Sequence, residues 1–282
     1  MNAAADVPGA EPFFLEGAPG QRFCLFHPPA RRCRGALLYV HPFAEEMNRS
    51  RRMAALQARA LAARGYGVLQ IDLHGCGDSS GDFGEARWET WRDDLARGAA
   101  WLDARLGGAP LTLWGLRLGA LLALDYARQA RRAPARMLLW QPVTRGSTYL
   151  TQFLRLRMAG DLLDGGAAQA GTGALRQALL DGETLEIAGY DLAPALAAAI
   201  DALDPLEALA PSCPTHWFEA LSAPGQEAPP GARRAAEAWR ARGVDLRLHA
   251  LPCPPFWSTP EITVGAAWLE ATAAALEDGD GV

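Results

Sequence analysis

A candidate reactive site lies near the middle of the chain, at a predicted turn between a strand and a helix. Residues 111–126 read LTLWGLRLGALLALDY, an apolar strand followed by Gly115-x-Arg117-x-Gly119 and an apolar helix start. Small residues around an apex side chain are typical of a sharp strand-to-helix turn that presents a nucleophile. The apex here is Arg117, whose guanidinium stays protonated and has no nucleophilic lone pair. The corner therefore predicts a reacting position whose side chain cannot attack a carbonyl.

Arg117 has three interpretations. It is a structural arginine that reaches a carboxylate of an inserted cap, or it is a clamp for an anionic ligand. The anion clamp is sound chemistry because a helix N-terminus already favours negative charge. A guanidinium adds two parallel donors that match a carboxylate or phosphate. In the third, Arg117 holds developing charge while another group attacks.

A second group of polar residues follows the apolar run at residues 36–40. His41 is either a packed, hydrogen-bonded histidine at the strand end or a catalytic residue. Glu45 and Glu46 are either a solvated helix start, favoured by the helix dipole, or hold a carboxylate that pairs with Arg117 or acts as a base. If that pair forms, an anionic ligand must compete for the arginine.

The turn at residues 72–81, DLHGCGDSSG, brings thiol, hydroxyl, imidazole and carboxylate groups together. Its three glycines predict a tight turn in which Asp and Ser side chains bond local backbone. Cys76 is an alternative nucleophile, and that role requires a lowered thiol pKa. No feature of the sequence indicates such a shift, so a structural turn is the favoured interpretation.

Periodicity predicts a parallel sheet with helical crossovers. The expected strands are residues 36–40, 68–73, 111–114, 137–140, 215–220 and 244–251, after a strand pair within 13–27; the expected helices are 50–65, 89–106, 232–242 and 261–276. Residues 144–209 break this rhythm with many alanines and few β-branched residues, which predicts a helical cap with a mobile stretch at 165–173. We therefore expect core segments at 1–143 and 210–282 around a cap at 144–209.

Composition excludes several functions. The formal net charge is −5, and the 27 basic residues are all arginines. A basic face for nucleic acid is therefore not expected, and neither a Schiff-base lysine nor a Walker A lysine is present. Five scattered cysteines without a CxxC pair indicate a reducing compartment and no zinc site. We expect no cofactor and no metal.

The chain start and its apolar runs bear on location. Residues 1–14 lack the basic and apolar regions of a secretory signal. No uninterrupted apolar run reaches the roughly 18 residues of a membrane span. A cytoplasmic protein with no membrane span is the expectation.

Several motifs occur in the order of one known superfamily. YVHPF resembles the strand and oxyanion loop of the α/β-hydrolases, DLHGCGDSSG their Asp-x-x-Gly-x-Gly-x-Ser turn, and WGLRLGA their nucleophile elbow. Together with PPFWSTPEI, these sequence segments resemble those of a narrower group. That group is the second hydrolase associated with the exosortase A and PEP-CTERM sorting system of exopolysaccharide-producing bacteria. The resemblance implies an α/β-hydrolase fold with a mostly parallel sheet, flanking helices and a small helical cap.

The resemblance also implies a Ser, acid and His triad, from which this chain departs. The serine position holds Arg117. The acid would follow the strand at 215–220, where Glu219 and Glu227 are the carboxylates before the next helix. The histidine would lie in residues 253–260, which contain none, and Trp257 or a neighbour stands there; His249 lies on the preceding strand.

Two hypotheses of different class follow. The first is a protein that binds a small anionic or acyl ligand, or a protein partner of the envelope and exopolysaccharide system. The second is a hydrolase of ester, thioester or peptide bonds that uses a non-standard group, with His41, Glu45, Glu46, Glu219 and Cys76 as weak candidates. The expected ligand-binding residues are His41, Phe43, Arg117, Leu118 and Trp257. Trp257 is either a core aromatic or a pocket wall suited to an acyl chain or sugar ring.

Overall fold

The structure is a computed structural model that describes residues 8–163 and 171–277. The expectation of mobility at 165–173 falls mostly on residues 164–170, and that of no secretory signal partly on residues 1–7; both sets lie outside the described residues. The described chain forms an eight-stranded sheet in the order β1-β2-β4-β3-β5-β6-β9-β10. Its strands are β1 Glu11–Glu16, β2 Gln21–His27, β3 Gly35–Val40, β4 Tyr66–Ile71, β5 Leu111–Leu116, β6 Arg136–Trp140, β9 Thr215–Leu221 and β10 Leu246–Pro252.

The sheet is parallel from β4 to β10, and β2 pairs antiparallel with β1 and with β4. The central strand β3 is buried along its whole length, as its unbroken apolar sequence predicts for a strand covered on both faces. A mostly parallel sheet flanked by helices is therefore confirmed. In such sheets, ligands bind at the carboxyl ends of the strands.

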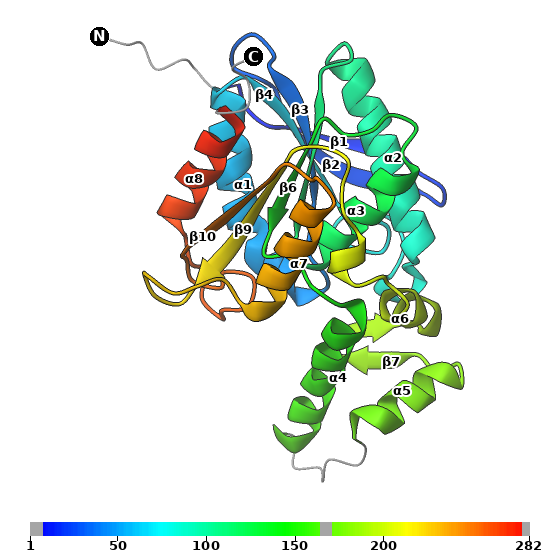
Figure 1. Cartoon of the computed structure of the whole chain (residues 1–282). Helices are drawn as coiled ribbons and strands as arrows, with labels where there is room; N and C mark the ends of the chain where they lie inside the picture. Colours follow the sequence, from blue (N-terminus) through cyan, green and yellow to red (C-terminus); the bar gives the residue numbers. More distant parts are fainter. Residues whose placement is uncertain (1–7, 164–170, 278–282) are drawn as a thin grey trace.

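Helices cover both faces of the sheet (Figure 1). They are α1 Glu45–Ala63, α2 Trp88–Arg105, α3 Leu118–Gln129, α7 Pro230–Ala241 and α8 Ala266–Glu277. Side chains of α1 and α8 belong to one buried cluster, which includes Trp114, Trp140 and Trp268. Side chains of α2, α3 and α7 belong to the other, which includes Trp217 and Trp239. These five tryptophans are fully buried, and rings of this size bury much apolar area on both sides of the sheet.

Two helix starts differ by five residues from the sequence prediction, and the starts of α2 and α7 by one or two. α1 begins at Glu45, five residues before the predicted start, because Met47 and Ser50 are buried and the apolar face extends back to the strand end. α8 begins at Ala266 and not at residue 261, since the Thr259 hydroxyl donates to the Glu261 carbonyl in a loop. Helical periodicity located both helices but not their first turns.

The segment between β6 and β9 lies against the carboxyl ends of the central strands (Figure 1). It contains α4 Gly146–Leu163, α5 Thr172–Leu180, α6 Pro194–Asp201 and a two-stranded sheet of β7 Leu185–Ile187 with β8 Tyr190–Leu192. This hairpin was not predicted. Its turn is Ala188–Gly189, with positive φ at both residues, and such a turn is hard to read when alanine replaces the usual Asn or Asp. Short 3₁₀ turns lie at Phe83–Glu85 and Leu206–Ala208.

Candidate functional site

The corner between β5 and α3 has the strained geometry of an elbow. Arg117 has φ 55° and ψ −121° and is the N-cap of α3. A Cβ on Gly119 would lie 2.4 Å from the carbonyl oxygens of Val40 and His41, and a Cβ on Gly115 would lie 2.5 Å from the Ala120 Cα. The two glycines are therefore required because the strand, the helix and the end of β3 approach at backbone distance. This packing forces the apex side chain out of the turn.

The Arg117 side chain is held by three neighbours. Its Nε lies 3.3 Å from Glu46 Oε1. Its guanidinium carbon lies 5.7 Å from the centre of the Tyr149 ring and 5.5 Å from that of Trp257, both within range of cation–π attraction. The side chain remains 17% exposed, so one edge of the cation reaches solvent.

Glu46 is the partner of Arg117, and it comes from the start of α1. The structural interpretation of Arg117 predicted a partner carboxylate in the cap. That part of the prediction is wrong, because the partner Glu46 belongs to α1. The other oxygen of Glu46 accepts a 3.1 Å hydrogen bond from the Tyr149 hydroxyl of the cap helix α4. Burial raises the pKa of Glu46, while the nearby Arg117 and Tyr149 lower it in part. Glu46 is thus not the solvated helix-start residue of the first interpretation.

Glu45 behaves differently from its neighbour. Its carboxylate is half-exposed and accepts hydrogen bonds from Asn48, Arg49 and the Tyr190 hydroxyl. The Asn48 hydrogen bond is the main cause of its lowered pKa. Glu45 is therefore an ordinary ionised carboxylate at the rim of the site, and it ties α1 to β8.

Two clefts meet at Arg117. The larger, about 420 Å³, has a mostly apolar wall and several charged groups; it is lined by Phe43, Ala44, Glu45, Glu46, Arg49, Arg117, Tyr149, Gln152, Phe153, Leu156, Ala188, Trp257 and Ser258. The smaller, about 260 Å³, is polar; it is lined by Arg117, Gln141, Pro142, Val143, Thr144, Arg145, Thr148, Tyr149, Gln152, Glu219, Pro229, Gly231 and Ala232. Among the described residues, neither lining contains a histidine or a cysteine. A guanidinium at a helix N-terminus is chemically suited to contact an anionic group.

Glu219 lies within β9 and not after it, as the search for an acid had expected. Its Oε1 accepts a 2.7 Å hydrogen bond from Trp217 Nε1, and the residue is 1% exposed. Burial raises the pKa of this carboxyl to about 7, against opposing effects of Trp217, Arg117 and Gln141. Glu227, the other acid considered, lies on the surface in an ion pair with Arg233.

His41 and Leu118, two of the expected ligand-binding residues, line neither cleft. Their side chains border a small separate cavity behind the elbow. His41 Nδ1 lies 2.7 Å from the Pro42 carbonyl oxygen, and its Nε2 accepts from the Leu73 N–H at 3.2 Å. Both ring nitrogens are thus occupied by backbone, and burial lowers the pKa of His41. These contacts match the interpretation of a packed strand-end histidine.

The turn after β4 is built from its own backbone contacts. Asp72 accepts from Arg51 at 2.9 Å and from the Asp78 N–H at 3.1 Å, and the Ser79 hydroxyl donates to the Asp72 carbonyl. Cys76 is buried, and burial raises the pKa of its thiol far above the ordinary value. A thiol held protonated is a poor nucleophile, so the candidate role for Cys76 is not supported.

Sequence reasoning missed Tyr149 and Gln141. Tyr149 lies four residues before Phe153 on α4, and this i,i+4 pair on one helix face was a readable signal for residues facing the site. Gln141 has φ 43° at the end of β6, and its Oε1 accepts from the Ala220 N–H at 2.6 Å. A strained non-glycine residue of this kind leaves no mark in the sequence.

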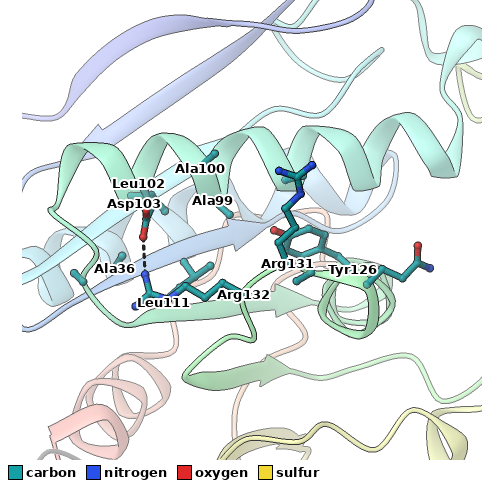
Figure 2. Close-up of a pocket in the computed structure, with 13 residues that line it drawn as sticks. Ala36, Ala99, Ala100, Leu102, Asp103, Leu111, Tyr126, Arg131 and Arg132 are labelled. Atoms are coloured by element: carbon teal, nitrogen blue, oxygen red, sulfur yellow. Dashed lines mark hydrogen bonds and ion pairs between the residues drawn. The ribbon is translucent and has the colours of Figure 1, made fainter.

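A further pocket of about 430 Å³ lies at the opposite end of the sheet (Figure 2). It is lined by alanines of α2 and by Leu111 and Tyr126, and the Asp103–Arg132 ion pair closes one side. It borders the amino-terminal ends of β3 and β5, whereas Arg117 lies at the carboxyl end of β5. This pocket is therefore separate from the site.

The sheet order, the flanking helices and the elbow between β5 and α3 are those of the α/β-hydrolase fold. Solved structures share the fold: Est1E from Butyrivibrio proteoclasticus with bound ferulic acid (TM-score 0.65, 13% identity, 94% of this chain and 96% of that chain) and a soluble variant of monoglyceride lipase from Saccharomyces cerevisiae in complex with a substrate analog (0.65, 14%, 99% and 96%). A malate-bound thermophilic esterase from Thermogutta terrifontis also matches (0.57, 22%, 96% and 97%). At these identities the likeness shows the fold alone.

The family follows from the sequence match. Residues 31–172, half of the chain, match the family described as serine aminopeptidase, S33, and the chain belongs to that family. Protein ABHD12B of Homo sapiens is 32% identical over 113 residues. This match covers 40% of this chain and 30% of the length of that relative.

Two negative findings complete the description of the site. In residues 8–163 and 171–277, no group of three or more His, Cys, Asp or Glu side chains is placed to hold a metal ion. No helix in the same ranges has the length and apolarity needed to cross a membrane.

Proposed function

We propose that this family member binds an anionic ligand with an acyl or other apolar portion, and that Arg117 contacts the anion. The observation that carries the proposal is the guanidinium at the apex of an elbow, at the meeting point of the two clefts. At this position a serine would attack, whereas an arginine attracts negative charge. The first N–H groups of α3 favour the same charge.

The larger cleft supplies the apolar part of the proposed site. Phe43, Phe153 and Trp257 border it, and the Phe43 and Phe153 rings are 5.0 Å apart in an edge-to-face arrangement. Leu156 is half-exposed and adds apolar surface to the same wall. Aromatic and aliphatic walls with a few charged groups are typical of small-molecule sites. An acyl chain beside Trp257 would place its carboxylate near Arg117.

Glu46 competes with the proposed ligand for Arg117. Its carboxylate lies 3.3 Å from Arg117 Nε, so a ligand carboxylate must displace it, share the guanidinium or bind after Glu46 takes up a proton. The raised pKa of Glu46 makes protonation less costly than for a surface carboxylate. The site therefore favours ligands that stay anionic at a pH where Glu46 is protonated.

The test is thermal unfolding with dodecanoate and with dodecanol, which has the same chain and no charge. A ligand that binds only the folded state at ~100 times its dissociation constant stabilises it by about 2.7 kcal/mol. We expect wild type to respond to dodecanoate more than to dodecanol, and Arg117→Ala to lose that difference. Arg49→Gln is the matched control, because Arg49 lines the same cleft but pairs with Glu45. An undiminished dodecanoate response in Arg117→Ala contradicts the proposal.

Hydrolysis is the second candidate, and family membership together with the retained elbow geometry favours it. It requires a nucleophile other than residue 117. Fluorophosphonate labelling and turnover of short and long p-nitrophenyl esters test this function. Clear labelling of one side chain, lost when that residue is replaced, would establish a hydrolase and overturn the binding-only proposal.

The setting in the cell is also part of the proposal. The phrases shared with exosortase-associated hydrolases support a role in the envelope and exopolysaccharide system, with a protein partner from it. We expect deletion of the gene to reduce exopolysaccharide or sorted protein, and the wild-type gene to restore them. Restoration by Arg117→Ala to the same level would show that the anion site is not needed there.

A further inference from the structure

The smaller cleft beside Arg117 differs in chemistry from the larger one. Besides Arg117, Arg145 and Glu219, it is lined by uncharged hydrogen-bonding groups: the side-chain amides of Gln141 and Gln152 and the hydroxyls of Thr144 and Thr148. Gly231, at the start of α7, lies beside Thr144 and forms part of the lining without a side chain. The cleft shares Arg117, Tyr149 and Gln152 with the apolar cleft, so a single ligand could occupy both.

Glu219 gives this cleft an unsatisfied acceptor. The residue is 1% exposed and is part of the cleft lining. Trp217 Nε1 donates to its Oε1, but Oε2 is buried and has no hydrogen-bond partner among the described residues. Gln141 also lowers the pKa of Glu219. Because Gln141 Oε1 accepts from the Ala220 N–H, the donor it offers is its Nε2 amide, and that group makes no hydrogen bond to Glu219 Oε2. A buried polar atom without a partner is uncommon in native structures and points to a missing donor.

We propose that this cleft binds hydroxyl groups carried by the anionic ligand, as in a sugar acid or an acylated polyol. This inference rests on the proposed function of Arg117. A hydroxyl group can donate to the free oxygen of Glu219 and accept from a glutamine amide or a threonine hydroxyl. Charged groups fit less well, because Arg117 and Arg145 repel a cation and an ionised Glu219 repels a second anion.

The chemistry divides the ligand into three parts. The anionic group binds Arg117, the apolar portion lies beside Phe153 and Trp257, and the hydroxylated portion lies between Thr148 and Glu219. Arg117 lines both clefts, so the anionic group that it binds would position the other two parts of the ligand. A ligand that lacks the hydroxyl groups would still bind, but without the contacts of the smaller cleft.

The test compares gluconate with hexanoate by ligand-detected NMR. Both are six-carbon monocarboxylates, and only gluconate carries hydroxyl groups. We expect wild type to bind gluconate about tenfold more tightly than hexanoate, a difference of about 1.4 kcal/mol. Thr148→Val should reduce this preference and leave hexanoate binding unchanged. Glu219→Gln removes a charge that interacts with Arg117, so its readout is the ratio of gluconate to hexanoate affinity, which should fall. Thr172→Val, on α5 and outside both clefts, is the matched control and should keep the preference.

Each outcome separates the two proposals. Equal binding of both acids, weakened alike by Arg117→Ala, overturns the hydroxyl site and leaves the anion site in place. A gluconate preference that survives both Thr148→Val and Glu219→Gln places the hydroxyl contacts elsewhere and also overturns the inference. Binding that is insensitive to Arg117→Ala, or no binding of either acid, overturns both. Thr148 is exposed, so its replacement tests the site even if Glu219→Gln fails to fold.

Discussion

Three individual residues near the site have strained backbone conformations. Ala44, Arg117 and Gln141 all have positive φ, and they follow the carboxyl ends of β3, β5 and β6. Such conformations cost about 1–3 kcal/mol each in non-glycine residues and cluster where function requires them. At Arg117 the close packing around Gly115 and Gly119 imposes this conformation. The three strained residues thus lie at the edge of the sheet where the proposed site is located.

Replacing Glu46 should strengthen anion binding. In Glu46→Gln the competing carboxylate is absent, so we expect the affinity for hexanesulfonate to rise about tenfold. A sulfonate stays ionised, which isolates the titration of the protein. Because the pKa of Glu46 is raised, wild-type affinity should increase as the pH falls through that pKa, whereas Glu46→Gln should show a flat profile. Calorimetric titration over a pH series measures both.

Glu45→Gln is the control for this prediction, since Glu45 lines the same cleft and pairs with Arg49. Its affinity and pH profile should remain those of wild type. An unchanged affinity in Glu46→Gln would show that Glu46 does not compete for Arg117.

Glu219 should make stability depend on pH. Its pKa is raised from 4.5 to about 7 in the folded state, so folding favours the protonated form. The stabilisation is therefore fully present below about pH 4.5 and is lost as the pH rises through about 7, by about 3 kcal/mol in total. Glu219→Gln resembles the protonated form, so relative to wild type it should gain stability between pH 5 and pH 8. Urea unfolding of both proteins at the two pH values measures this gain.

The exposed Glu227 provides the comparison for Glu219. Glu227→Gln should change the free energy of unfolding by no more than about 1 kcal/mol, because its ion pair with Arg233 is exposed. If Glu219→Gln shows the pH dependence of wild type, the carboxyl is ionised throughout and the buried environment assigned to it is wrong.

At the scale of elements, the elbow depends on how closely β5, α3 and the end of β3 approach. Gly119→Ala would place a methyl group against the carbonyl oxygens of Val40 and His41, which belong to backbone and cannot turn aside. We expect a loss of about 1–3 kcal/mol or more, measured by urea unfolding. Gly160→Ala, in α4 with no atom near the new methyl, should instead gain about 0.5 kcal/mol. Equal stabilities of the two variants would contradict the close approach.

A buried ion pair joins β2, α2 and the turn after β4. Arg22 Nε lies 2.6 Å from Asp94 Oδ1, both side chains are buried, and Asp94 Oδ2 accepts from the His74 N–H. Asp94→Ala leaves the buried Arg22 charge without its counter-charge, with carbonyl oxygens as its remaining hydrogen-bond acceptors. We therefore expect a loss of about 3–5 kcal/mol in chemical unfolding.

Asp103→Ala is the control for that loss. Asp103 pairs with Arg132 in an exposed bridge at the rim of the far pocket (Figure 2), and such pairs contribute about 0–1 kcal/mol. Similar losses in the two variants would show that burial of the Arg22–Asp94 pair has no special role.

At the scale of the whole molecule, α1 ties the cap segment to the sheet. Glu46 accepts from Tyr149 of α4, and Glu45 accepts from Tyr190 of β8. The segment between β6 and β9 is thus held by the same two carboxylates that border the apolar cleft. Ligand binding at Arg117 would disturb the Glu46 contact first, so the site and the cap segment are physically linked.

The sequence predicted the sheet well because buried parallel strands are continuous apolar runs, as at residues 36–40 and 137–140. It also predicted the position of Arg117, since Gly115 and Gly119 mark the backbone approach. It did not predict the role of Tyr149 or Gln141, because their contacts depend on how the cap segment and the end of β9 meet the elbow. The difference between Glu45 and Glu46 was equally hidden, since adjacent carboxylates look alike until burial separates them.

The proposed function requires that Arg117 receive the anionic group of the ligand. The most direct measurement is the ¹H–¹⁵N NMR signal of the Arg117 Nε–H group, assigned by its disappearance in Arg117→Lys. On titration with hexanoate we predict a saturable shift of this signal, with the Arg49 signal unchanged. If hexanoate shifts other signals to saturation while the Arg117 signal does not move, Arg117 does not receive the anionic group.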